Sequence, residues 1–396
     1  MRAARATNPM RPHRFLGACT FALFAAFAPA LSATTITPAS DDEVIDVLPA
    51  VSGSRADARR LRRQLAQQPQ DAALALTAAR RNLDQAHELG DPRFAGMAMS
   101  AIAAWPDAAT APDEVLMMRA TLQQYLHEFD ASAATLKTLL ARPGASRPQA
   151  WLTLATVRRV QGRYAESDAA CAQVARAGAA LHASACAAEN AALRGDVEHA
   201  RATFATLLAD ARQPATTQAW LMTSVAELEQ RAGRAAAAEA AFRAALALDP
   251  DPYTTLDYAD LLIEQKRPAQ ALALLKGQVR SDAVLLRLAI AGVQARSPGA
   301  SADAAEMRER IALANERPDA KVFHGREQAM FALAVDGDAA RALELARGNV
   351  VQQREPLDLL VLAQAARASG DANALQDAKR VVGTIGLVDR RIEAIL

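Results

Sequence analysis

The chain has 396 residues, of which 51% are hydrophobic and only 4% aromatic, so alanine and leucine supply most of the apolar content. This composition favours α-helices and argues against a β sandwich or barrel, which draw on β-branched and aromatic residues. With 22% charged residues beside that apolar half, a wholly disordered chain is excluded. The 45 basic and 44 acidic residues leave a net charge of +1, which is no signature of nucleic-acid binding.

Residues 1–33 have the three-part pattern of a secretory signal peptide. Four arginines precede an apolar run from Phe15 to Phe27, and small residues follow up to Ala33, after which a signal peptidase would cut. Two alternatives stay open. The segment could remain as a membrane anchor, although Pro29 and an apolar run shorter than the roughly 20 residues of a membrane span argue against it. Cys19 could be lipidated, although almost no apolar residue precedes it.

Export changes the charge and the setting of the cysteines. Cleavage after Ala33 leaves 41 basic and 44 acidic residues in a periplasmic chain that has no membrane span. Cys171 and Cys186 would then be its only cysteines, in an oxidising compartment. They either form a disulfide across a loop of about 15 residues or remain buried thiols.

Residues 34–56 form a predicted acidic linker between the signal and the repeats. Asp41, Asp42, Glu43 and Asp46 stand among aliphatic residues there. The segment is either an exposed linker or a short interaction motif that lies in a groove of the same protein or docks to another chain.

A repeat of about 34 residues organises residues 57–382. Its turn positions are spaced by 33 to 38 residues, which predicts about nine pairs of helices, each pair joined by a tight turn where glycine can take positive φ. Small residues dominate seven positions before and five after each turn, as required where two helices cross closely, and larger apolar residues follow nine after it. The turn positions are Gly90, His127, Gly162, Gly195, Gly233, Lys266, Gly299, Gly337 and Gly370.

Two stretches show the repeat most clearly, one from Ala150 to Glu166 with Trp151, Gly162 and Tyr164, the other from Gly233 to Pro250 with Phe242. In these the chain resembles the tetratricopeptide repeat (TPR) family. The resemblance implies an all-α, right-handed superhelical solenoid. Residues 383–396 are predicted to form a C-terminal capping helix, because the last unit of a solenoid must present one polar side.

The resemblance is looser at the two ends of the array. Asp91-Pro92, a helix-breaking pair, follows the first turn, and Arg308 and Lys379 replace apolar residues in the last repeats. His127 and Lys266 also stand where the family has glycine, which leaves the geometry of those turns open.

The family resemblance also implies a binding groove, because the residues six and thirteen positions before each turn face its concave side. Six before, Glu189, Glu227 and Asp260 form an acidic row; thirteen before stand His182, Trp220 and Tyr253. Such a groove would take a basic or polar segment of a protein or peptide, and the lysine and asparagine clamp by which some family members hold a C-terminal carboxylate is missing. The alternative is that these acids are ordinary solvated helix residues.

Motifs for catalysis or cofactors are missing from the sequence. It has no Cys-x-x-Cys, His-Glu-x-x-His, phosphate loop, Gly-x-Gly-x-x-Gly or Gly-x-Ser-x-Gly. His127 beside Glu128 is the nearest to a general base pair, but sequence neighbours point to different helix faces. His182 and Cys186, four residues apart, supply only two of the four ligands of a tetrahedral metal site. No catalytic residue, metal or cofactor is therefore predicted.

The sequence as a whole predicts an exported, non-catalytic TPR scaffold that binds a protein or peptide partner in its groove. One alternative is a structural spacer in an envelope assembly or secretion complex. A hydrolase built on His127 and Glu128 is the other.

Overall fold

The computed structural model describes Ser40 and residues 54–144, 146–316 and 325–396. The predicted signal peptide with its Cys19 and nearly all of the predicted linker lie outside the described residues. The helical repeats lie in the unit Ala56–Leu396.

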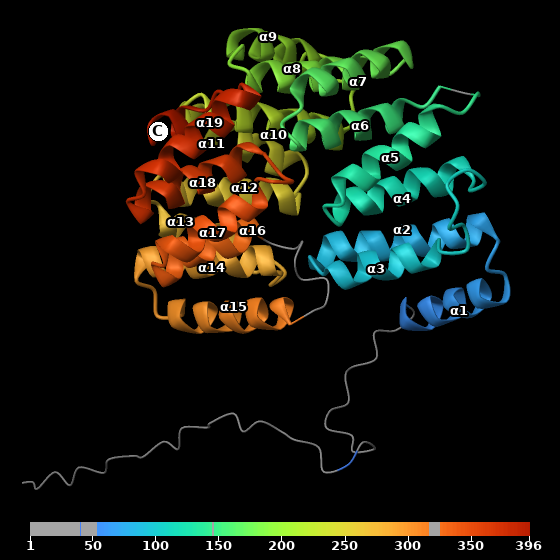
Figure 1. Ribbon diagram of the computed structural model, residues 1–396, viewed down its shortest axis with the longest axis horizontal. Helices are drawn as coiled ribbons and strands as arrows, with labels where there is room; N and C mark the ends of the chain where they lie inside the picture. The colour runs from blue at the N-terminus through green and yellow to red at the C-terminus, as the bar shows by residue number, and fades with distance from the viewer. Residues whose placement is uncertain (1–39, 41–53, 145, 317–324) are drawn as a thin grey trace, which may run out of the picture. The chain divides into compact units, whose positions relative to one another are not determined.

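Every regular element within the described residues is helical, which confirms the predicted all-α fold (Figure 1). The helices are α1 (Ser54–Gln67), α2 (Ala72–Leu89), α3 (Pro92–Ala101), α4 (Asp113–Tyr125), α5 (Phe129–Leu140), α6 (Pro148–Val160), α7 (Tyr164–Arg176), α8 (Ala180–Leu193), α9 (Val197–Leu208), α10 (Ala215–Arg231), α11 (Ala235–Leu248), α12 (Pro252–Glu264), α13 (Pro268–Leu275), α14 (Asp282–Ala295), α15 (Ala300–Asn315), α16 (Gly325–Phe331), the π-helix η2 (Ala332–Asp336), α17 (Ala339–Asn349), α18 (Pro356–Ser369), α19 (Ala372–Ile385) and α20 (Arg390–Glu393).

Consecutive helices pack as hairpins, and each hairpin also packs on the next, as in a solenoid of repeats. From α2 paired with α3 to α18 paired with α19, the described residues contain nine such hairpins, with α16 and η2 together forming the first helix of the eighth. The core is correspondingly divided into clusters of buried aliphatic residues along the array.

The turn positions are confirmed at all but one of the nine predicted sites. Eight of them have φ between 59° and 91°, including the non-glycine residues His127 and Lys266, so both keep the tight turn in a conformation that costs an L-residue energy. The prediction for Gly299 is wrong. Arg296 takes the left-handed conformation at the end of α14, and Gly299, with φ −86°, instead stands at the N-cap of α15.

The small-residue columns explain how closely the helices approach. Ala155, Ala226 and Ala259 before the turns and Ala200 and Ala238 after them are all fully buried. In the eighth hairpin the π-helix η2 inserts one residue, so the buried alanine is Ala329 rather than the expected Met330.

The structure also explains three departures from the TPR pattern. Arg308 and Lys379 are exposed, and Met307 and Ala378 beside them fill the core instead. The pair Asp91-Pro92 does not break a helix but begins α3, because the Asp91 carboxylate accepts a hydrogen bond from the Arg93 N–H and proline suits the first helical turn.

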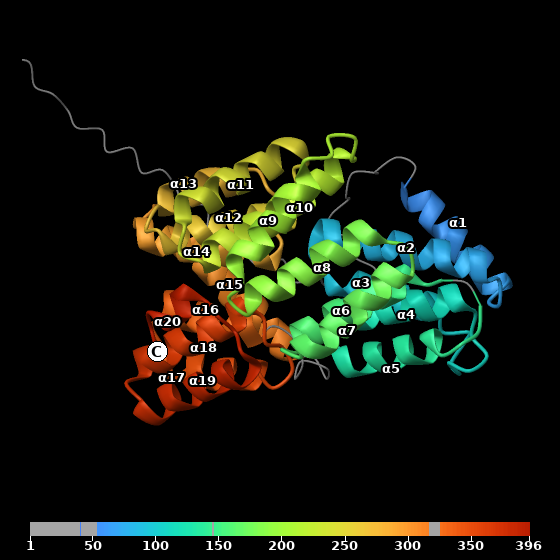
Figure 2. The same ribbon diagram turned by 90° about the horizontal axis from the view of Figure 1, so that it is seen from above.

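The late hairpins, from α16 to α19, lie against the early hairpins that precede them in the chain, such as those of α6 and α8 (Figures 1 and 2). The Arg354 N–H donates to the carbonyl of Val160 at 2.7 Å, and the Val388 N–H donates to the carbonyl of Leu193 at 2.8 Å. The predicted capping segment at 383–396 therefore contacts α8 as well as its own hairpin. Of the helices described, none is long and apolar enough to cross a membrane.

Candidate functional site

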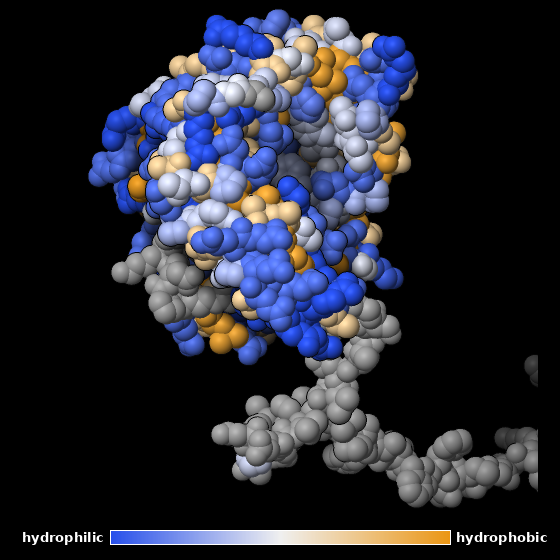
Figure 3. Space-filling model, turned by 90° about the vertical axis from the view of Figure 1, so that its right-hand side faces the viewer, coloured by the Kyte–Doolittle hydropathy of each residue, from blue (hydrophilic) through white to orange (hydrophobic). Residues whose placement is uncertain are grey.

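A cavity of about 590 Å³ lies between the early and the late hairpins. One wall comes from the first helices of successive hairpins, α6, α8, α10, α12 and α14; the other comes from the starts of α16 and α18 and from α20. Nine carboxylate side chains and five arginines line it, so acids exceed bases. Figure 3 shows one face of the molecule, which is mostly hydrophilic and is hollowed.

The lining residues of each helix follow from helical geometry. On α10 and α12 one row of lining residues recurs at spacings of four, three and four residues, on one face of the helix. On α10 the row is Trp220, Ser224, Glu227 and Arg231, and on α12 it is Tyr253, Asp257, Asp260 and Glu264.

The structure places five of the six predicted groove residues on this cavity: Glu189, Glu227, Asp260, Trp220 and Tyr253. The sixth, His182, lies in an adjoining depression with Glu189 and Trp220. Its ring stacks on that of Trp220 with centroids 5.7 Å apart. The acidic row and the aromatic side chains therefore lie together in space.

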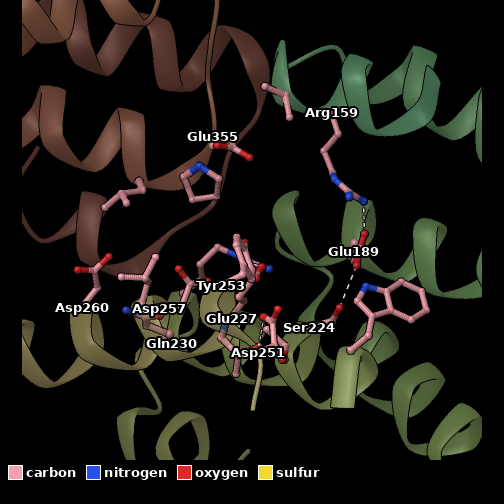
Figure 4. Close-up of a pocket in the computed structure, with 18 of the residues that line it drawn as sticks. Arg159, Glu189, Ser224, Glu227, Gln230, Asp251, Tyr253, Asp257, Asp260 and Glu355 are labelled. Carbon is pink, nitrogen blue, oxygen red and sulfur yellow. Dashed lines mark hydrogen bonds and ion pairs between the residues drawn. The ribbon is translucent and has the colours of Figure 1, made fainter. Parts of the chain in front are cut away.

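Two members of the acidic row are paired within the chain. Asp260 accepts two hydrogen bonds from the Arg287 guanidinium, at 2.9 and 2.6 Å, and both side chains are about nine-tenths buried. Glu189 pairs with Arg159 and accepts a hydrogen bond from the Ser224 hydroxyl at 2.9 Å (Figure 4). Arg287 occupies both oxygens of Asp260, so the charge of this carboxylate is neutralised within the chain.

The third member, Glu227, belongs to a less neutralised group. It accepts a hydrogen bond from the Tyr253 hydroxyl at 2.9 Å and lies 3.5 Å from Arg231. Burial raises the pKa of Glu227, with a further contribution from the Glu189 carboxylate, although Arg231 opposes the rise. Tyr253 is 58% exposed. The negative charges of Asp257 and Glu227 raise the pKa of its phenol well above the usual value.

Asp257 is, like Asp249, an acid of the cavity that forms no ion pair within the described residues. It is half-buried on α12, and the described part of the chain supplies it with no hydrogen bond or ion pair. Burial raises its pKa well above the ordinary value, and the carboxylates of Glu227 and Asp260 raise it further, against the opposing effect of Arg287 and Arg326. A cation placed beside Asp257 would relieve this repulsion.

Two buried polar atoms on the cavity wall also make no hydrogen bond within the described residues. They are the hydroxyl of Tyr164, which is 4% exposed, and Nε of Arg231. Burial raises the pKa of Tyr164 to about 12, so the hydroxyl stays protonated. Buried polar atoms that make no hydrogen bond are uncommon in folded proteins.

Sequence reasoning missed Asp257 and the arginines of the site. Asp257 lies three residues before Asp260 and four after Tyr253, so helical spacing alone could have found it. Asp257 and Arg287 both stand nine residues before the turns at Lys266 and Arg296, a position that the rule of six and thirteen residues does not include. Arg326, Glu355 and Arg391 come from α16, the start of α18 and α20, and no local pattern reveals that these elements return to the groove.

The other residues singled out in the sequence lie elsewhere. His127 occupies a turn and stacks on Phe129, with ring centroids 5.5 Å apart. Cys171 and Cys186 form a disulfide between α7 and α8, with Cα atoms 5.8 Å apart, so Cys186 cannot join His182 in a metal site. Within the residues that the structure describes, no group of three or more His, Cys, Asp or Glu side chains could hold a metal ion.

Fold and site together define an all-helical solenoid of hairpins that encloses an acidic cavity bordered by aromatic side chains. No protein-family model and no curated protein matches the chain. Among solved structures, a Rap protein complexed with Competence and Sporulation Factor is similar, with 12% identity, a TM-score of 0.49, and coverage of 86% of this chain and 93% of that chain. The TPR domain of P58(IPK) is similar at 14% identity with a TM-score of 0.22, covering 80% of this chain and 95% of that one.

Proposed function

We propose that this chain is an exported, non-catalytic binding protein whose cavity takes a positively charged segment of a protein or peptide. The observation that supports this most is Asp257, a carboxylate without a partner in the described chain, beside Glu227 and the exposed ring of Tyr253. An arginine or lysine side chain would gain a charge-assisted hydrogen bond there and could stack on the tyrosine.

The scaffold suits this role because the lining helices are fixed before a partner arrives. Arg287 joins α12 to α14, and the bond between Ser224 and Glu189 joins α10 to α8. A preformed site loses little ordering entropy on binding. TPR and Rap folds are associated with the binding of peptides and proteins, which agrees with the proposed binding role. Such repeats typically lack catalysis.

Export is supported by two independent features. Residues 1–33 carry the signal-peptide pattern, and the bond between Cys171 and Cys186 is of the kind that persists in an oxidising compartment such as the periplasm. N-terminal sequencing of the secreted protein is expected to begin at Thr34. Recovery of a chain that begins at Met1 from the cytoplasm would contradict export.

The binding proposal is tested by selection from a library of random decapeptides displayed on beads. The wild-type chain is expected to enrich arginine and lysine, and the Asp257→Asn chain to lose most of that enrichment. Asp84→Asn is the matched control, since Asp84 is an exposed acid on α2 that does not line this cavity. Enrichment of acidic peptides, or equal enrichment by both variants, would count against the proposal.

A structural spacer in an envelope complex is the second candidate. It is favoured by the internal pairing of Glu189 and Asp260, which uses much of the acidic row within the chain. Alanine replacement of Trp220 and Tyr253 separates the two roles. Loss of peptide capture supports recognition, whereas intact capture together with loss of complex assembly supports the spacer.

A further inference from the structure

The C-terminal segment Leu387–Ile392 lies along the early hairpins at the edge of the cavity. The Val388 N–H donates a hydrogen bond to the Leu193 carbonyl. The Val388 side chain packs on the turn after α8, at Gly195. A Cβ added to Gly195 would lie 3.1 Å from the Val388 side chain. The turn thus has no side chain where this segment passes, and the segment is closely fitted to its surroundings.

Arg391 of this segment lines the cavity. Its guanidinium donates to Glu264 of α12 at 3.0 Å and is held from its own side by Asp389 at 2.7 and 3.0 Å. Although burial opposes it, the charges of Glu264 and Asp389 raise the pKa of Arg391. Glu264 also accepts a hydrogen bond from Gln230 at 2.8 Å. An arginine from the end of the chain therefore already occupies part of the acidic groove.

We propose that Val388 and Arg391 of this segment act as the chain's own ligand, and that the partner is a segment of the same chemistry, with an arginine beside aliphatic residues and a backbone N–H free to bond to Leu193. This inference rests on the proposed function and names the partner class for that site. The partner displaces Arg391 from Glu264 and Val388 from the turn after α8. Asp257 then receives a further basic side chain of the same partner.

Competition of this kind sets a threshold for binding. A tethered segment acts at an effective concentration in the millimolar range, so a free segment of equal intrinsic affinity binds the intact chain weakly. Weakening the tether's own contacts should therefore raise the affinity for a free segment. This effect is opposite to the loss of affinity that follows when a groove residue is removed.

The test uses the full chain and a fluorescein-labelled peptide with the sequence of residues 386–396, measured by fluorescence anisotropy. The Arg391→Ala chain is expected to bind this peptide at least about tenfold more tightly than the wild-type chain. The Arg390→Ala chain is the control and should bind like the wild type, because the Arg390 side chain is 71% exposed and pairs with Glu393 of its own helix. A peptide in which alanine replaces Arg391 should not bind.

A second variant and a second measurement distinguish release of the segment from misfolding of the chain. Glu264→Gln removes the groove's side of the ion pair, so it should loosen the tail without raising the peptide's affinity. Hydrogen exchange at the Val388 amide should quicken in Arg391→Ala and Glu264→Gln and stay unchanged in Arg390→Ala. Unchanged exchange in the first two variants would overturn the inference.

The outcomes also separate this inference from the proposed function. If library-selected basic peptides bind the wild type, but the Arg391→Ala chain gains no affinity for the tail peptide, the inference fails and the function stands. If neither the tail peptide nor any library peptide binds any of these variants, the proposed function itself fails.

Discussion

The ion pair between Asp260 and Arg287 offers a sharp test of the site's architecture. It joins α12 to α14 through two hydrogen bonds, and the side chains are only 11% and 8% exposed. Arg287→Met keeps most of the side-chain volume and removes the charge. Breaking a buried pair on one side costs about 3–5 kcal/mol, because the remaining charge is left buried without compensation.

The cost should depend on pH, because Arg287 also lowers the pKa of nearby Asp257. Without the arginine, the pKa of Asp257 rises further above its unfolded value. A carboxyl with a raised folded-state pKa contributes stability that is present below its unfolded pKa and is lost as pH rises through the folded value. The Arg287→Met chain should therefore lose less stability at pH 4 than at pH 8.

Urea denaturation followed by circular dichroism at both pH values measures this. Arg212→Met is the matched control, since the Arg212 side chain is 91% exposed and its pair with Asp210 is screened by solvent and contributes little to stability. The double variant Asp260→Leu with Arg287→Met should recover much of the loss, because no buried charge remains at that position. A loss at pH 8 no larger than that of Arg212→Met would refute the reasoning.

Three further predictions concern stability. Replacing Cys171 and Cys186 by serine, which opens a loop of 15 residues, should lower the free energy of unfolding by about 3 kcal/mol in denaturant, and no change would contradict a formed disulfide. Lys266→Gly should stabilise by up to about 1 kcal/mol, since φ is 59° there, and a lower melting temperature would argue against that turn. Burial raises the pKa of Asp358 to about 7, so wild-type stability should fall as pH rises from about 4 through 7, and Asp358→Asn should flatten that part of the profile.

The repeat was predictable because it depends on the spacing of residues that are close together in the sequence. Alanines such as Ala155 and Ala226 recur at fixed distances from the turns, and the structure buries them completely. The prediction at Gly299 is wrong because a glycine indicates a turn without requiring one, and here Arg296 has the positive φ instead. The one-residue shift at Met330 came from a π-helix, which leaves no compositional trace.

The site was predictable only on the side that the repeats themselves build. Glu227 and Tyr253 follow from helical register, and the same register contains Asp257. The opposite wall depends on long-range contacts, such as that of Arg391 with Glu264, which are 127 residues apart. Nothing in the local sequence of either residue indicates its partner, so the internal neutralisation of the groove could not be foreseen.

Calorimetric titration of the full chain with a tri-arginine and a tri-glutamate peptide shows whether the cavity recognises a cation. Tri-arginine should bind the wild type, Asp257→Asn should weaken this binding roughly 10- to 100-fold through the lost charge-assisted hydrogen bond, and tri-glutamate should not bind. Equal affinity of tri-arginine for both chains, or preferential binding of tri-glutamate, would contradict the claim that the cavity recognises a cation.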